Sequence, residues 1–162
     1  MITDEIKLRT NVLKEDIINI RNIVASTGFF RNDEIDVAVD IVVETNEKGE
    51  SAGYKFVFAE INNETVAYVC FGLIPCTLVS YDLYWIACHE KFRGKGLGKI
   101  LLEKCEEIVK SLRGKAIYIE TSSKEIYEPT RNFYIKNNYD LMHTYPDFYD
   151  IGDNKLVYVK SI

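Results

Sequence analysis

One glycine-rich segment constrains the fold of this chain more than any other feature. Between Lys91 and Ile108 the sequence reads KFRGKGLGKILLEKCEEI, with glycines at Gly94, Gly96 and Gly98 directly ahead of apolar residues at helical spacing. Glycine reaches φ > 0, so consecutive N–H groups can turn toward one concavity. At a helix N-terminus those groups and the helix dipole favour an anion. The segment therefore predicts a strand, a phosphate-binding loop and a helix.

The charge distribution supports an anionic ligand at this loop. The whole chain has a formal net charge of -5, which argues against a nucleic-acid-binding protein. Between Glu90 and Lys99, however, four basic residues face a single acid. The loop is thus locally positive, although the protein as a whole is acidic.

The rest of the pattern predicts one α+β domain over residues 1–162. Strands are expected near residues 6–9, 54–58, 66–69, 83–88, 116–120, 141 and 155–159, and helices near 17–24, 32–42, 97–112 and 130–136. The strand before the glycine loop, the helix after it and the next strand form one right-handed βαβ unit in a mixed sheet.

Several classes of protein are excluded by what the sequence lacks. The cysteines form no C-x-x-C pair and the two histidines add no zinc spacing, so we expect reduced thiols and no metal. The N-terminal stretch is charged and has no apolar core, and the longest apolar run, 65–79, is broken by Gly72 and Pro75. We therefore expect a cytoplasmic protein without a membrane segment.

Two common phosphate-binding motifs fit the loop poorly. A dinucleotide fingerprint, G-x-G-x-x-G, would need glycine at Lys99 or Leu101, although Glu120 stands about where a ribose-binding acid would. A Walker A loop would need Ser or Thr at Ile100 and glycine at Arg93. A nicotinamide-dependent oxidoreductase stays open as a less favoured alternative.

The motif that remains is R-x-x-G-x-G, from Arg93 to Gly98. With its surroundings LYWIACHEKFRGKGLGKILL, and with the later segment TRNFYIKNNY, it resembles the GNAT superfamily of acyl-CoA-dependent N-acetyltransferases. The resemblance in element order covers almost the whole chain. It implies a mostly antiparallel central sheet with helices on both faces. It also implies that the loop wraps the pyrophosphate of acetyl-CoA, used as a co-substrate.

The resemblance also assigns roles to individual residues. Tyr134 matches the tyrosine proposed as general acid beside the coenzyme A sulfur, and Asp82 matches a carboxylate that takes the amine proton, with Glu120 as second candidate. The fourth strand is expected to splay from the fifth and to bind the thioester arm through its backbone. The implied cofactor-binding residues are Ile86, Ala87, Cys88, Arg93, Gly94, Lys95, Gly96, Leu97, Gly98 and Lys99.

Two positions depart from the family pattern. Tyr127 stands where an asparagine often touches the pantetheine, and Asn138 replaces a glycine before the final aromatic residue. Asparagine tolerates the left-handed conformation, so only the first change puts a cofactor contact in doubt. A covalent route through Cys88 is a minor hypothesis, since neighbouring His89 would point to the opposite face of the strand.

The expected activity is transfer of an acetyl group from acetyl-CoA to an amine of a small molecule or protein, in a ternary complex. A catalytically silent acyl-CoA sensor of the same fold is the alternative from another class. The aromatic and acidic stretch from Tyr145 to Asp153, with Phe29 and Phe30, is expected to shape the acceptor cleft and to favour a cationic amine. A homodimer is compatible with the resemblance, but no residue specifies its interface.

Overall fold

The order of strands and helices is the order that the sequence predicts. The structure, a computed structural model, describes residues 5–162. The strands are β1 (Ile6–Arg9), β2 (Lys55–Ile61), β3 (Glu64–Leu73), β4 (Ser80–Cys88), β5 (Ala116–Ser122), β6 (Asp140–Asp150) and β7 (Asp153–Ser161). The helices are α1 (Asp16–Ser26), α2 (Asn32–Lys48), α3 (Leu97–Ser111) and α4 (Glu128–Lys136), with short 3-10 turns at Gly49–Ala52, Glu90–Phe92 and Glu125–Tyr127.

The strands are hydrogen-bonded in the order β1-β2-β3-β4-β5-β7-β6. The β1–β2, β2–β3, β5–β7 and β6–β7 ladders are antiparallel. The β4–β5 ladder is parallel, which a helical crossover such as α3 makes possible. The α+β class, the mostly antiparallel sheet and the βαβ unit are thereby confirmed.

The chain divides into two compact units. The first runs through Gly72 and resumes over Trp85–Glu107, and the second comprises Leu73–Tyr84 and Ile108–Ile162. Both β4 and α3 continue from one unit into the other. The expectation of a single domain over residues 1–162 stays a prediction.

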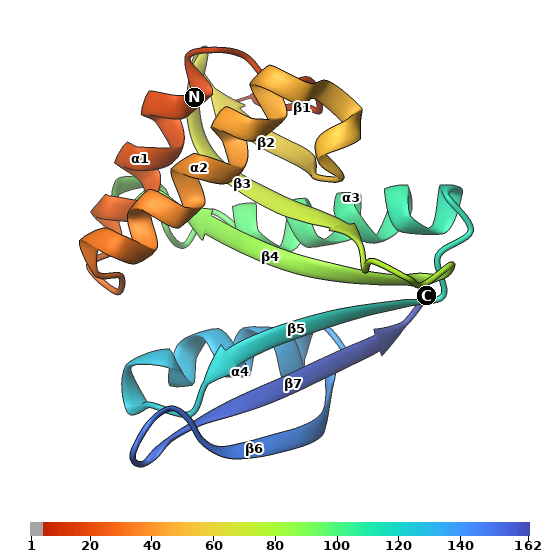
Figure 1. Ribbon diagram of the computed structural model, residues 1–162. Helices are drawn as coiled ribbons and strands as arrows, with labels where there is room; N and C mark the ends of the chain where they lie inside the picture. Colours follow the sequence, from red (N-terminus) through yellow and green to blue (C-terminus); the bar gives the residue numbers. More distant parts are fainter. Residues whose placement is uncertain (1–4) are drawn as a thin grey trace. The chain divides into compact units, whose positions relative to one another are not determined.

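In the first unit, α1 and α2 lie on one face of the strands and α3 lies on the other (Figure 1). A core of apolar side chains, among them Ile20, Val42 and Phe58, fills the layer between the two helices and the strands. The turn between β2 and β3 consists of Asn62 and Asn63, both with positive φ, the conformation that tight two-residue hairpin turns require.

In the second unit, α4 covers one face of the strands (Figure 1). Ile117 and Ile119 of β5 and Tyr158 of β7 are buried on that face. The alternate residues of the same strands point the other way and are mostly only partly buried. This second, open face carries polar side chains, and two of them are candidate catalytic groups.

Two helix ends show how local chemistry sets the boundaries. The N-cap residue of α2 is Arg31, whose backbone N–H donates a 2.8 Å hydrogen bond to the Glu34 carboxylate. At the end of α4, Asn138 adopts φ 66°, the left-handed conformation expected there.

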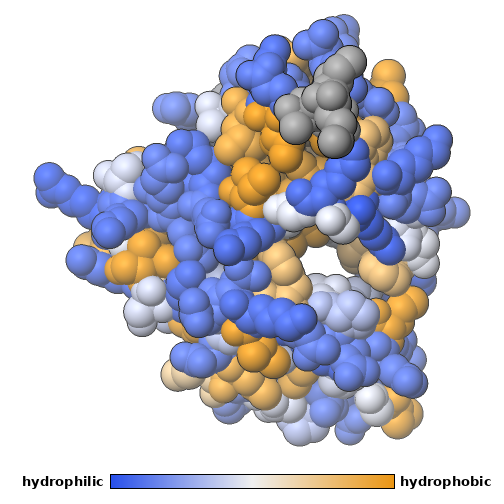
Figure 2. Space-filling view, turned by 180° about the vertical axis from the view of Figure 1, so that it is seen from behind, coloured by the Kyte–Doolittle hydropathy of each residue, from blue (hydrophilic) through white to orange (hydrophobic). Residues whose placement is uncertain are grey.

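Hydrophilic residues cover most of the surface seen in Figure 2, and apolar residues form separate patches between them. Over residues 5–162, every helix is too short or too polar to cross a bilayer.

Candidate active site

The glycine loop owes its conformation to two of its three glycines. Gly94 and Gly96 have φ values of 78° and 76°, whereas Gly98 lies inside α3. A Cβ atom at either of the first two positions would meet nothing within 4 Å. The requirement for glycine is therefore conformational rather than steric, because the left-handed region is costly for residues with a Cβ.

The backbone amides at the start of α3 point to an external ligand. The first N–H of the helix that donates within the helix ladder is that of Ile100, to the Gly96 carbonyl at 3.2 Å. Among residues 5–162, the N–H groups of Gly96, Leu97, Gly98 and Lys99 have no acceptor. A helix N-terminus with free amides is a favourable site for a phosphate group.

The basic side chains of the loop are exposed. Arg93 donates a 3.4 Å hydrogen bond to the carbonyl of Thr27, and its guanidinium lies 5.1 Å from the centre of the Phe29 ring. Lys95 Nζ lies 5.6 Å from the centre of the Phe92 ring. Both cations belong to the loop that carries the open amides, and they add positive potential to it.

The last residues of β4 precede this loop in the same unit. Ala87 is buried among apolar residues, and Ile86 and Cys88 are partly buried. Their side chains carry no chemistry that an acyl group needs, so any role in binding belongs to their backbone. Phe30, from the connection between α1 and α2, packs edge-on against Trp85, with ring centres 4.9 Å apart.

The environment of Cys88 opposes a covalent mechanism. Burial raises the pKa of its thiol, and the nearby Arg93 offsets that effect only in part. The Cys88 thiol donates to the His89 carbonyl at 3.5 Å, and His89 Nδ1 accepts from the Lys91 amide at 3.3 Å. His89 thus caps a turn, and Cys88 remains a thiol rather than a thiolate.

Tyr134 lies on α4 and is 5% exposed. Its ring packs against Tyr139 and Tyr158, with centres 6.1 and 6.0 Å away. Burial raises the pKa of the Tyr134 hydroxyl well above its usual range. The hydroxyl therefore stays protonated and can donate a hydrogen bond to a developing negative charge.

Asp82 and Glu120 lie on the open face of the second unit. Asp82 is paired with Tyr118 in the parallel ladder, and Glu120 is two residues further along the same strand. Burial, reinforced by the charge of Glu120 and opposed by Lys155, raises the pKa of Asp82 to about 6. A carboxylate with such a pKa can accept a proton near neutral pH.

The structure places the proposed acid and base on opposite faces of the strands of the second unit. Tyr134 packs under the buried face, beside Tyr158. Asp82 alternates with the buried residues Tyr81 and Leu83, so its side chain faces the other way. The β4–β5 ladder ends at Leu83, close to the point where the resemblance implies that the strands separate.

Sequence reasoning missed Lys155. Its Nζ lies 3.3 Å from Glu120 Oε1 and 3.9 and 4.8 Å from the centres of the Phe148 and Tyr145 rings. The alternation of β7 could have placed Lys155 on the open face, but its partners lie on two other strands. The aromatic stretch that was expected to receive a cationic acceptor therefore already holds a cation of the chain itself.

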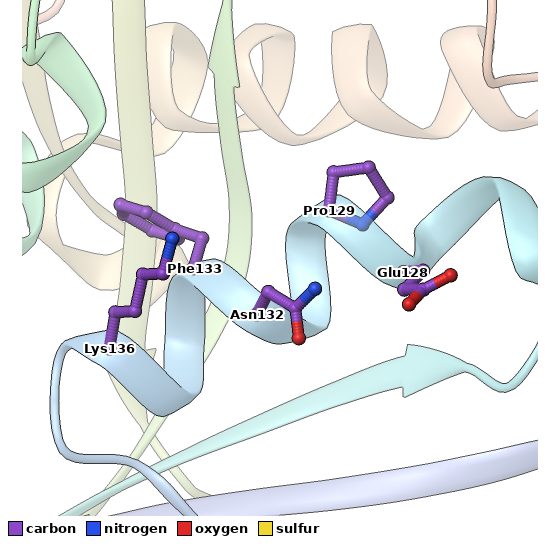
Figure 3. A pocket seen from close by; sticks show the side chains of 5 residues that line it. All are labelled: Glu128, Pro129, Asn132, Phe133 and Lys136. Carbon is purple, nitrogen blue, oxygen red and sulfur yellow. The ribbon is translucent and has the colours of Figure 1, made fainter.

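A shallow hollow of about 420 Å³ lies on the exposed side of α4. Pro129, Phe133 and Lys136 project along the same side of the helix, and Asn132 and Glu128 complete the lining (Figure 3). The hollow lies on the same helix as Tyr134, whose own side chain is buried. In the described part of the chain, the acidic, histidine and cysteine side chains form no cluster that could hold a metal ion.

Comparisons with known proteins agree with this geometry. The model of the family described as Acetyltransferase (GNAT) matches residues 19–139. A GNAT-family protein from Desulfovibrio desulfuricans is 37% identical, with a TM-score of 0.96 over 97% of this chain and 99% of the other. None of the curated protein sequences matches the chain.

More distant structures share the fold alone. An aminoglycoside 6'-N-acetyltransferase complexed with coenzyme A is 16% identical, with a TM-score of 0.74 over 97% of this chain and 96% of that one. The ribosomal-protein-S18-alanine N-acetyltransferase of Escherichia coli is 14% identical, with a TM-score of 0.76 over 98% of this chain and 94% of that one. These two proteins act on very different acceptors, so the fold does not identify an acceptor.

Proposed function

Because the chain belongs to the GNAT family of acetyltransferases, we propose that it moves an acetyl group from acetyl-CoA to an amine by direct attack in a ternary complex. The amine nitrogen bonds to the thioester carbon, the carbon–sulfur bond breaks, and coenzyme A leaves as a thiol. No acetyl group is held covalently by the protein, since Cys88 is a poorly ionised thiol. The acceptor is a small-molecule or protein amine.

The open amides at the start of α3 carry the proposal. Four N–H groups without an acceptor in the described chain, two left-handed glycines and Arg93 suit the diphosphate of acetyl-CoA. We propose that Arg93 to Lys99 bind this diphosphate and that the backbone of Ile86, Ala87 and Cys88 binds the thioester arm. Bound there, acetyl-CoA supplies an activated acyl group.

Tyr134 has the properties of a hydrogen-bond donor to the departing sulfur. Full proton transfer from a tyrosine of ordinary pKa to a thiolate is unfavourable by about 2 kcal/mol, because the reference pKa values of the phenol and the thiol are about 10 and 8.5. Burial raises the pKa of Tyr134 further, which makes full transfer still less favourable. We therefore assign Tyr134 to stabilising the thiolate. The thiolate then takes a proton from solvent, to which the base returns the proton of the amine.

Asp82 is proposed as the base that removes the proton of the acceptor amine. Its pKa of about 6 keeps it ionised at neutral pH while leaving it more basic than an ordinary aspartate. Asp82 is thus assigned to the attacking amine and Tyr134 to the departing sulfur, so the two roles belong to two separate side chains.

One experiment tests the activity and its alternatives together. The protein is incubated with acetyl-CoA and a panel of primary amines, amino acids, polyamines and peptides, and the release of coenzyme A thiol is followed. We expect amine-dependent release and a product heavier by about 42 Da, the mass added when an acetyl group replaces a hydrogen. Failure of every amine would contradict the proposed activity.

Thermal-shift titration identifies which alternative holds in that case. A ligand at about 100 times its dissociation constant adds roughly 2.7 kcal/mol of stability. An acyl-CoA sensor would be stabilised by acetyl-CoA without turnover. A nicotinamide-dependent oxidoreductase would instead be stabilised by NAD and not by acetyl-CoA.

A further inference from the structure

Lys155 is an enclosed cation on the open face of the second unit. Its side chain is 13% exposed, although lysine is among the residues that are seldom buried. Two aromatic rings and the Glu120 carboxylate surround its ammonium group, at 3.9 Å and 4.8 Å from the ring centres and 3.3 Å from Oε1. Such an arrangement fixes the position of the charge.

The same face brings Lys155 and Glu120 together with Asp82. Glu120 is opposite Val157 in the β5–β7 ladder, and Lys155 is two residues away on the same strand. Because paired residues in adjacent strands point the same way, the three charged side chains share one face. Glu120 accepts a hydrogen bond from Lys155. Asp82, by contrast, accepts no hydrogen bond from residues 5–162.

One ammonium group cannot neutralise two carboxylates, and Lys155 contacts Glu120 directly. The carboxylate of Glu120 is occupied by its ion pair with Lys155, at 3.3 Å. Asp82 is affected by both partners at longer range, with Glu120 raising its pKa and Lys155 lowering it. The neighbouring titratable groups include Tyr149 on β6, whose pKa is raised to about 12 by burial and, among other charges, by Glu120. On the same face lie Tyr84 on β4, Tyr118 on β5, and Asp140, His143 and Tyr145 on β6.

We propose that Lys155 is a positioning residue that selects the catalytic base: by pairing with Glu120 it leaves Asp82 as the carboxylate that receives the acceptor proton. This inference rests on the proposed acetyl transfer, which needs a base. It also means that Tyr145 and Phe148 serve mainly to hold Lys155 rather than to receive a cationic acceptor.

The test uses two substitutions with opposite expected effects. Lys155→Met removes the positive charge, so the acidic limb of the pH profile of kcat/KM should move upward by about half to one pH unit. Glu120→Gln removes a negative charge, so the same limb should move downward. Lys155→Arg keeps the charge and should restore the original limb. A lysine with a purely structural role would lower activity without moving the limb.

Lys160→Met is the matched control. Lys160 is also on β7 and its Nζ lies 5.5 Å from the centre of an aromatic ring, that of Tyr139. It is paired with the buried Ile117, so it belongs to the other face. Its substitution should leave the acidic limb unchanged.

A carboxyl-carbon NMR titration of the free protein measures Asp82 without any turnover. We expect its midpoint to rise in Lys155→Met and to fall in Glu120→Gln. Equal midpoints in all variants, or shifts in the same direction, would overturn the proposal. An Asp82 midpoint that shifts while the kinetic limb stays fixed would also overturn it, because Asp82 would then not be the base. Absence of acetyl transfer with every acceptor would instead show that the proposed function fails, and the titration would still report on the three charges.

Discussion

Asp82 and Tyr134 are both ionisable groups whose environment changes their chemistry. Each has a raised pKa with burial as the main cause, but the consequences differ. A raised pKa makes the carboxylate a better base near neutral pH, and it keeps the phenol protonated as a donor. One physical effect therefore suits two groups to opposite roles.

Activity should depend on the ionisation of Asp82. The base must be deprotonated, so kcat/KM is expected to rise with pH through about 6. Asp82→Asn should lower kcat/KM by about 10²–10⁴-fold and abolish that limb. Initial rates between pH 5 and 8, roughly the range in which such a base titrates, provide the measurement. A variant that keeps the same limb would assign the titration to another group.

The free energy of unfolding should also depend on Asp82, but here the protonated form is the favourable one. The folded state binds a proton at Asp82 more tightly than the unfolded chain, so this contribution to stability is complete below the ordinary aspartate pKa. It is lost as pH rises through about 6. At neutral pH, Asp82→Asn should therefore raise the free energy of unfolding by about 1 kcal/mol, after allowance for solvent screening of a half-exposed group. Urea unfolding at acid and neutral pH tests this, and an equal effect at both would contradict it.

Tyr134→Phe should separate catalysis from binding. Loss of a hydrogen bond made only as the sulfur departs should lower kcat by about 10- to 100-fold and leave the Kd for acetyl-CoA within about twofold. Single-turnover rates and equilibrium titration give the two quantities. Unchanged turnover would remove Tyr134 from the mechanism.

At the scale of elements, the glycine loop could be predicted from the sequence because its signal is local. Three glycines and their basic neighbours occupy six consecutive positions, Arg93 to Gly98, and the helix that follows has regular apolar spacing. The β2–β3 hairpin could be predicted for the same reason, since two asparagines stand between two segments with the residue pattern of strands. The contacts of Lys155 with Glu120, Tyr145 and Phe148 could not be predicted. These residues come from β5, β6 and β7, and only the pairing registers of the strands bring them together.

Gly96→Ala should weaken cofactor binding by altering the loop. A residue with a Cβ at φ 76° costs roughly 1–2 kcal/mol, and the loop can relieve this strain by turning its amides away from the ligand. The Kd for acetyl-CoA should then rise about tenfold. Isothermal titration measures the change.

Gly53→Ala is the matched control for that substitution. Gly53 has φ 83°, and a Cβ atom there would also meet nothing within 4 Å, but it lies between the turn Gly49–Ala52 and β2. The Gly53→Ala variant should lose a similar amount of stability while binding acetyl-CoA as the unmodified chain does. Equal losses of affinity in both variants would show that the effect is not specific to the loop.

At the scale of the whole molecule, the two compact units raise the question of cooperativity. The boundary falls within β4, between Tyr84 and Trp85, and within α3, between Glu107 and Ile108. Breaking either element would cost backbone hydrogen bonds in a strand or helix. The continuity of both elements favours a single folding unit, as the chain length also suggests.

Urea unfolding should therefore be one transition. Trp85 is the single tryptophan and belongs to the first unit, whereas nine of the 11 tyrosines belong to the second. Fluorescence of Trp85, near-ultraviolet signals of the tyrosines and far-ultraviolet circular dichroism should give the same midpoint. Separate midpoints would show that the units unfold independently, and the prediction of one domain would be wrong.

The outermost strand also limits how copies of this chain can associate. β6 stands at one end of the strand order, and its side chains are exposed. Pro146 offers no backbone donor, Asp147 adopts φ 50°, and the register breaks between Tyr145 and Asp150. At this edge, a second chain could extend the sheet only along the stretch before Pro146. Growth that needs both edges of the sheet is hindered there, which protects concentrated protein against open-ended fibrillar growth.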